Sequence, residues 1–131
     1  MSEEEFEVLF EILRSPHISV NKLYQRMKGR ISKARLIKIL RNLNKEGFLK
    51  VERDPRHKQK LHLRVSEDVE RLAGSLMGAL STLRDTSVAN QIESLLNTYH
   101  ELASRVTRPE LRDFLRSLIK RQVDSLITNI L

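Results

Sequence analysis

The 131-residue sequence predicts a mainly α-helical protein with one small β-hairpin, and three observations lead to this prediction. Apolar residues recur at the spacing of an amphipathic helix along most of the chain. The spacing changes to strict alternation after Gly47 and becomes helical again at Ser66. Positive charge is concentrated in residues 1–65, which hold 16 Lys and Arg against 8 Asp and Glu, a net charge of +8. Residues 66–131 hold 8 against 9, a net charge of −1, and the total is +7.

The segment from Ser32 to Lys45 is predicted to be a helix with two faces of opposite character. Its apolar stripe consists of Leu36, Ile39, Leu40 and Leu43, and its opposite side carries Arg35, Lys38, Arg41, Asn42 and Lys45. Ser32 suits the N-cap position because its hydroxyl can accept a backbone N–H bond. Gly47 follows the last periodic residue and suits a helix stop.

Two further helices are expected before this basic helix. Residues 3–14 have helical spacing, and the three glutamates at their start suit the positive end of the helix dipole. Ser19 is expected to cap a short helix over residues 20–28. A turn at Gly29 then joins this short helix to the basic helix, which is the arrangement of a helix-turn-helix.

A β-hairpin is expected directly after the basic helix. Residues 48–53 and 60–65 alternate between apolar and polar side chains, and Asp54-Pro55 between them signals a turn. One face of the hairpin is expected to pack on the helices, and the other carries basic side chains. Together these elements predict a winged helix-turn-helix domain over residues 1–66.

The rest of the chain, residues 67–131, is predicted to be a C-terminal helical extension used for dimerisation. Its first helix is expected to run to about residue 84, and residues 85–87 either break that helix or continue it. Residues 88–106 follow a heptad pattern with steps of four and three residues. A final helix is expected over residues 109–130, because Pro109 suits a first helical turn.

Within the winged helix-turn-helix superfamily, the sequence resembles the MarR-type transcriptional regulators in the run from Ser32 through Ile39-Leu40-Arg41-Asn42-Leu43-Asn44-Lys45-Glu46-Gly47-Phe48-Leu49. The Leu-x-x-x-Gly-Phe ending of the basic helix recurs in that family, and Val65-Ser66 stands where the family usually has Leu-Thr. The resemblance covers about residues 5–70. The sequence departs from the family at His57-Lys58-Gln59, where family wings usually carry an acidic residue followed by arginine. The turn at residues 28–31 is longer than is typical, and nearly all of the extension is C-terminal, as in PadR-type relatives.

These features predict sequence-specific binding of double-stranded DNA by a transcriptional regulator. The basic helix is expected in the major groove, where base edges can be distinguished, and the hairpin near the minor groove. Arg35 and Asn42 are candidates for base contacts, whereas the lysines are better suited to phosphates. The expected DNA contacts are Ser32, Lys33, Arg35, Lys38, Arg41, Asn42 and Lys45 on the basic helix, and Arg56, His57, Lys58 and Lys60 on the hairpin.

A homodimer is expected because one such domain reads only a few base pairs. A twofold axis would place two basic helices about 34–36 Å apart, to match one turn of DNA. The candidate dimer interface is Val88, Ile92, Leu95, Tyr99, Leu102 and Val106 in the heptad segment, with Leu118 and Leu126 in the final helix. The same heptad pattern also serves a pair of helices within one chain, and this alternative remains open.

Catalysis, cofactors and membrane insertion are not expected. The chain has no cysteine, only four glycines with no phosphate-binding loop, and four histidines without metal-ligand spacing, so we expect neither an enzyme nor a metal site. No apolar run is long enough to span a membrane, and the start of the chain is acidic where a signal peptide would be basic. We therefore expect a cytoplasmic protein without cofactors.

Two other functions could use the same fold. A non-specific architectural protein of the chromatin type would use the basic charge without reading sequence. A winged-helix module that contacts other proteins is the second alternative, although the density of positive charge on the basic helix argues against it. The resemblance also implies small aromatic effectors, but no residues in this sequence establish a pocket, and any effector is unknown.

Overall fold

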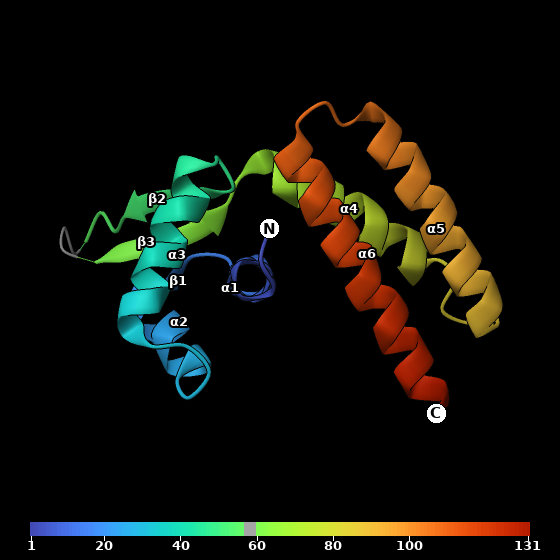
Figure 1. Ribbon diagram of the computed structural model, residues 1–131, viewed down its shortest axis with the longest axis horizontal. Coiled ribbons are helices and arrows are strands. Elements are labelled where there is room, and N and C mark those ends of the chain that lie inside the picture. The colour runs from blue at the N-terminus through green and yellow to red at the C-terminus, as the bar shows by residue number, and fades with distance from the viewer. Residues whose placement is uncertain (57–59) are drawn as a thin grey trace. The chain divides into compact units, whose positions relative to one another are not determined.

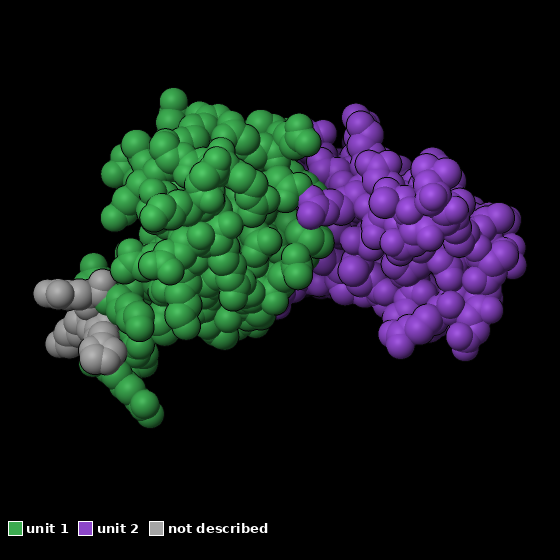
Figure 2. All heavy atoms as spheres, turned by 90° about the horizontal axis from the view of Figure 1, so that it is seen from below, with its two compact units in different colours: residues 1–67 green, residues 68–131 purple. Residues whose placement is uncertain are grey.

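The computed structural model describes residues 1–56 and 60–131, which form six helices and a small sheet (Figure 1). The chain divides into two compact units, residues 1–67 and 68–131 (Figure 2). In chain order the elements are α1 (Glu3–Arg14), β1 (Ile18–Ser19), α2 (Val20–Met27), α3 (Lys33–Lys45), β2 (Leu49–Arg53), β3 (Leu61–Val65), α4 (Glu67–Ser81), α5 (Val88–Arg105) and α6 (Pro109–Ile130). The predicted fold class, mainly α-helical with a β-hairpin wing, is confirmed.

Helix α1 begins with a reciprocal pair of hydrogen bonds. The Ser2 hydroxyl accepts from the Glu5 backbone N–H at 3.1 Å, and the Glu5 carboxylate accepts from the Ser2 N–H at 3.2 Å. Such a capping box satisfies two donors that the first turn of a helix otherwise leaves free. The buried side of α1 includes Leu9 and Ile12, both with no exposed surface. The bounds predicted for this helix are confirmed.

A type II turn joins α2 to α3. The Arg30 N–H donates to the Met27 carbonyl at 3.0 Å, and Lys28 between them has φ −57° and ψ 134°. Gly29 follows with φ +89°, a left-handed conformation that costs glycine little and other residues more. The predicted Ser19 cap is also present, because its hydroxyl accepts from the Lys22 N–H at 3.2 Å. The helix-turn-helix is therefore confirmed.

Helix α3 has defined stops at both ends. The Ser32 hydroxyl accepts from the Arg35 N–H at 3.1 Å. At the other end, Gly47 has φ +82° and donates to the Asn44 carbonyl at 3.1 Å, while the Phe48 N–H donates to the Leu43 carbonyl at 2.9 Å. This pair of bonds is a Schellman motif, which satisfies carbonyls that the last helical turn leaves open. The predicted apolar stripe, Leu36, Ile39, Leu40 and Leu43, is buried throughout.

The described residues form a three-stranded antiparallel sheet in the order β1-β3-β2. Strands β2 and β3 make the predicted hairpin, with Leu49 opposite Val65 and Arg53 opposite Leu61. Strand β1 was not expected, because the sequence predicted no strand between the helices over residues 3–14 and 20–28. Ile18 pairs with Leu63 across β3, so this two-residue strand depends on a partner far away in the sequence.

The inner face of the hairpin is only partly buried. Leu49, Leu63 and Val65 are buried, as predicted for a face that packs on the helices. Val51 and Leu61 lie on the same face but nearer the tip, and they are 43% and 39% exposed. The alternation of apolar residues in the hairpin therefore continues past the last residues that the core buries.

In the second unit, the helical structure is interrupted between α4 and α5. Helix α4 ends at Ser81, three residues before the predicted end, and Ser87 caps α5 by accepting from the Asn90 N–H at 3.2 Å. The buried Gln91 side chain donates to the carbonyls of Leu83 at 2.9 Å and Thr86 at 3.2 Å. A buried amide that satisfies turn carbonyls fixes this break, because unpaired buried polar groups are costly. Of the two readings left open for residues 85–87, the break is correct.

Helices α5 and α6 pack against each other within the unit. Leu95 from α5 and Phe114, Leu115 and Leu118 from α6 have no exposed surface. Pro109 occupies the first turn of α6, as predicted. Within the described part of the chain, no helix is both long enough and apolar enough to cross a membrane.

Leu95→Ala should lower the free energy of unfolding by about 2–5 kcal/mol, because it removes a fully buried side chain and leaves a cavity between α5 and α6. The matched control is Leu96→Ala on the same helix, where the side chain is 43% exposed, and its cost should stay below about 1 kcal/mol. Urea denaturation followed by circular dichroism measures both. Equal losses for the two variants would contradict the intrachain packing of Leu95.

Candidate nucleic-acid interface

The side of α3 away from the core is a continuous basic surface. All seven residues that the sequence predicted as DNA contacts on this helix are exposed: Ser32, Lys33, Arg35, Lys38, Arg41, Asn42 and Lys45. The 13-residue helix is about 20 Å long at about 1.5 Å per residue, so these side chains cover nearly its whole length. The core holds the opposite side, since α3 packs against α1 and β2 (Figure 1).

Most of the positive charge on this surface is not neutralised by neighbouring acids. Among the residues that the structure describes, no ion pair involves Lys33, Lys38, Arg41 or Lys45. The first turn of α3 carries no acidic residue. Unpaired cations along one exposed helix face make a surface of positive potential that attracts polyanions and exchanges their counterions.

Arg35 differs from the other cations of this surface because it has an acidic partner. Its Nη2 lies 3.3 Å from Glu4 Oε1 of α1, and the two side chains are 43% and 47% exposed. The Arg35 backbone N–H is bonded to the Ser32 hydroxyl, so the residue sits in the capped first turn of α3. The sequence prediction named Arg35 as a DNA contact and Glu4 as part of the acidic start of the first helix, but it did not pair the two.

Ser32 lies at the exposed start of α3, but its hydroxyl oxygen already accepts a bond as the helix cap. The hydroxyl proton remains available as a donor, since a hydroxyl both donates and accepts. The structure therefore gives Ser32 a role in forming α3 that precedes any contact with a ligand.

Asp54 organises the described part of the hairpin tip. Its Oδ1 accepts from the Arg56 N–H at 2.9 Å, its own N–H donates to the Lys60 carbonyl at 2.9 Å, and its Oδ2 lies 3.5 Å from His62 Nε2. The side chains of Arg56 and Lys60, both predicted DNA contacts, are exposed. The other two predicted contacts on the tip, His57 and Lys58, lie outside the described residues.

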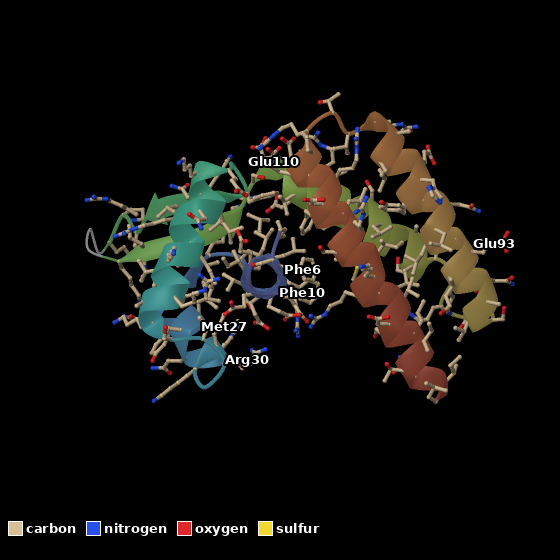
Figure 3. All side chains as sticks on the ribbon, viewed as in Figure 1. Phe6, Phe10, Met27, Arg30, Glu93 and Glu110 are labelled. Atoms are coloured by element: carbon tan, nitrogen blue, oxygen red, sulfur yellow. The ribbon has the colours of Figure 1, made fainter. Side chains whose placement is uncertain are left out.

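The first unit also exposes cations that the sequence prediction did not select. Lys28 and Arg30 lie in the turn before α3, and Arg30 extends from it beside Met27 (Figure 3). Lys50 and Arg53 lie on β2, where Lys50 Nζ is 3.3 Å from Glu67 Oε1. Sequence alone could not separate these residues from the predicted contacts, because every basic residue in this region has the same charge and a polar neighbourhood.

The predicted dimer contacts divide into two groups in the second unit. Leu95, Val106 and Leu118 are buried within one chain, so these three side chains belong to the intrachain core. Val88, Ile92, Tyr99, Leu102 and Leu126 are half-buried. The apolar side chains that remain most exposed in this unit are others, namely Met77, Leu96, Ile127, Ile130 and Leu131.

In the described part of the chain, no three residues among His, Cys, Asp and Glu come together as a metal ion would require. The candidate interface of the first unit is the basic surface of α3 together with the exposed side chains of Arg56 and Lys60.

The solved structures that are similar to this chain include those of three proteins. A double mutant of Lactococcus lactis ZitR is 18% identical with a TM-score of 0.52, over 100% of this chain and 76% of that one. Streptococcus pneumoniae FabT in complex with DNA is 18% identical with a TM-score of 0.50, over 81% and 78%. Reduced AbfR bound to DNA is 20% identical with a TM-score of 0.50, over 78% and 72%.

These neighbours are winged-helix transcriptional regulators of the MarR family. The chain shares their fold. The resemblance found in the sequence is therefore confirmed for the architecture of the chain. Neither a protein-family model nor a curated protein matches the sequence.

Ser32→Ala should lower the free energy of unfolding by about 1 kcal/mol, because it removes the oxygen that caps α3. Ser32→Thr keeps a hydroxyl at the cap and should preserve most of the stability. Urea denaturation measures both variants. If Ser32→Ala were as stable as the wild-type protein, the hydroxyl would have no capping role in solution.

Proposed function

We propose that this protein is a sequence-specific transcriptional regulator that binds double-stranded DNA as a homodimer. The observation that carries the proposal is the row of unpaired cations, Lys33, Lys38, Arg41 and Lys45, on the exposed face of the second helix of a helix-turn-helix. Support also comes from FabT and AbfR, two proteins of the same fold whose structures were solved with DNA.

The major groove of B-DNA is about 12 Å wide and accepts one α-helix. Helix α3 is suited to this groove because its apolar face is held by the core and its exposed face is basic. Lys33, Lys38 and Lys45 would contact phosphates, which fix the position of the protein without selecting sequence. Arg35 would read guanine edges and Asn42 adenine edges, since guanidinium and amide groups match those patterns.

The hairpin would contact the flanking minor groove. Arg56 and Lys60 are exposed at its tip, beside His57 and Lys58 in the sequence. An arginine that enters a narrow minor groove meets enhanced negative potential, so this contact favours some DNA shapes over others.

Dimerisation would use the apolar surface of the second unit that the intrachain core leaves open. Leu96 on α5 and Ile127 and Ile130 on α6 are the candidates, because they are 43%, 39% and 62% exposed. Among the predicted dimer contacts, the half-buried Ile92 of the heptad segment and Leu126 of the final helix can still contribute. The net charge of −1 on residues 66–131 sets no strong electrostatic barrier to self-association.

A non-specific architectural protein remains the second candidate function. The observation that favours it is the excess of cations over amide side chains on α3, which carries five lysines and arginines but two asparagines, Asn42 and Asn44. Charge alone gives affinity for any duplex, and that affinity falls steeply with salt.

Selection from a random DNA pool at near-physiological salt should enrich a near-palindromic site with half-sites about 10 base pairs apart. Arg35→Ala should then relax the preference for one base pair in each half-site, at a cost of about 1–3 kcal/mol for the enriched duplex. Lys45→Ala should weaken binding to all duplexes alike and reduce the slope of log affinity against log salt by about 1.

Two results of these measurements would decide against sequence-specific binding. One is a pool that shows no enrichment. The other is Arg35→Ala and Lys45→Ala having equal effects on every duplex. Both are expected of the architectural alternative.

Leu96→Glu should convert the dimer to a monomer, because it places a charge on an exposed apolar surface without disturbing the intrachain core. Light scattering measures the mass, and affinity for the enriched duplex should fall with it. Asn90→Glu is the matched control, since it adds the same charge at an exposed position of the same helix on a different side. A wild-type monomer would overturn the homodimer, and a dimeric Leu96→Glu variant would remove Leu96 from the interface.

A further inference from the structure

We infer that Glu4 of α1 is a positioning residue for DNA recognition, which holds the Arg35 guanidinium for base reading and keeps it from phosphates. The inference rests on the proposed function, since it concerns how α3 reads sequence. Its basis is the ion pair of 3.3 Å between Glu4 Oε1 and Arg35 Nη2, formed by residues 31 positions apart.

The pair is built on two rigid elements. Glu4 lies in the first turn of α1, which the Ser2–Glu5 capping box fixes, and α1 packs directly against α3. Arg35 lies in the first turn of α3, which Ser32 caps. Because both backbones are ordered by their caps and by the core, the carboxylate meets the guanidinium at little cost in backbone entropy.

The geometry leaves Arg35 able to read a base. The contact with Glu4 uses Nη2, and no other partner of this guanidinium occurs among the described residues. Arginine presents several N–H donors in a fixed fork, so the donors not bound to Glu4 can address the O6 and N7 acceptors of guanine. The Glu4 carboxylate, bound to one side of the Arg35 guanidinium, thereby sets the direction in which the remaining N–H groups point.

The other cations on α3 make the contrast clear. Lys33, Lys38, Arg41 and Lys45 have no acidic partner in the described part of the chain, and they are free to move toward any phosphate. Arg35 is held at the start of the helix, where residues of a recognition helix meet base edges. Glu4 also adds a negative charge that opposes a phosphate at this point.

Both effects of Glu4 increase discrimination. Without it, Arg35 loses its fixed direction, which weakens the contact to the preferred base. Arg35 would then also contact phosphates of any duplex, which strengthens non-specific binding. The ratio of affinities for the enriched and the random duplex should therefore fall when Glu4 is neutralised, by an amount limited by the modest strength of an exposed ion pair, about three-fold.

The test compares Glu4→Gln with Glu3→Gln. Glu3 lies in the same helical turn and lines the same surface hollow beside Arg30, but the ion pair of Arg35 is with Glu4 and not with Glu3. Glu3→Gln removes the same charge and leaves the ion pair intact. Any effect of charge alone on DNA binding should therefore be equal in the two variants, and an effect of positioning should appear only in Glu4→Gln.

The measurements are dissociation constants for the enriched duplex, for its single-base variants and for a random duplex of the same length. We expect Glu4→Gln to lower the affinity ratio about three-fold and to relax preference at the same base pair that Arg35→Ala relaxes. Glu3→Gln should leave the ratio unchanged. In the Arg35→Ala background, Glu4→Gln should change base preference no further, because its partner is gone.

Two results would overturn the inference, and they are distinguishable. If the wild-type protein prefers its enriched duplex and Glu4→Gln behaves like Glu3→Gln, Glu4 has no positioning role although the proposed function stands. If the wild-type protein shows no preference among duplexes, the proposed function fails and the positioning role fails with it.

Discussion

The burial of one side of α3 is the constraint on which the first unit depends. Leu36 and Leu43 have no exposed surface, and complete burial of each such side chain stabilises the fold by about 1.5–3 kcal/mol. Because the helix is held on this side, Lys38 and Arg41 face solvent, and neither forms an ion pair with another described residue. The Schellman bonds end α3 at Gly47, and the next residue, Phe48, is buried in the same core. Strand β2 begins directly after Phe48, so the core that holds α3 also fixes the start of the hairpin.

Local signals made most of this unit predictable from the sequence. Ser19, Ser32 and Gly47 mark helix ends by side-chain and backbone chemistry that acts over a few residues, and each end is found where it was expected. Strand β1 could not be predicted in this way, because its two residues gain strand structure only by pairing with Leu63, far away in the sequence. The exposure of Val51 escaped prediction for the same reason, since alternation indicates a face of a strand but not where the core ends.

The second unit shows what a periodic apolar pattern can and cannot predict. The heptad spacing predicts that α5 has an apolar side, and such a side must be covered by another surface. It contains no information on whether the cover is α6 of the same chain or a second copy, and Leu95 and Leu118 prove to be buried within one chain. Gln91 adds a constraint of another kind, since its buried amide satisfies the turn carbonyls that separate α5 from α4.

Composition predicted a polyanion as the partner of α3, but it could not predict which cations of this basic surface would read bases and which would contact phosphates. Net charge is a sum over residues, and it treats Arg35 and Lys45 as equal. The fold makes them different, because α1 brings Glu4 to within 3.3 Å of Arg35 and leaves Lys45 without an acidic partner among the described residues. A paired guanidinium is restricted in direction, whereas an unpaired ammonium can follow any phosphate. Affinity and selectivity can therefore reside in different residues of one helix, and the contact that separates them joins positions 31 residues apart.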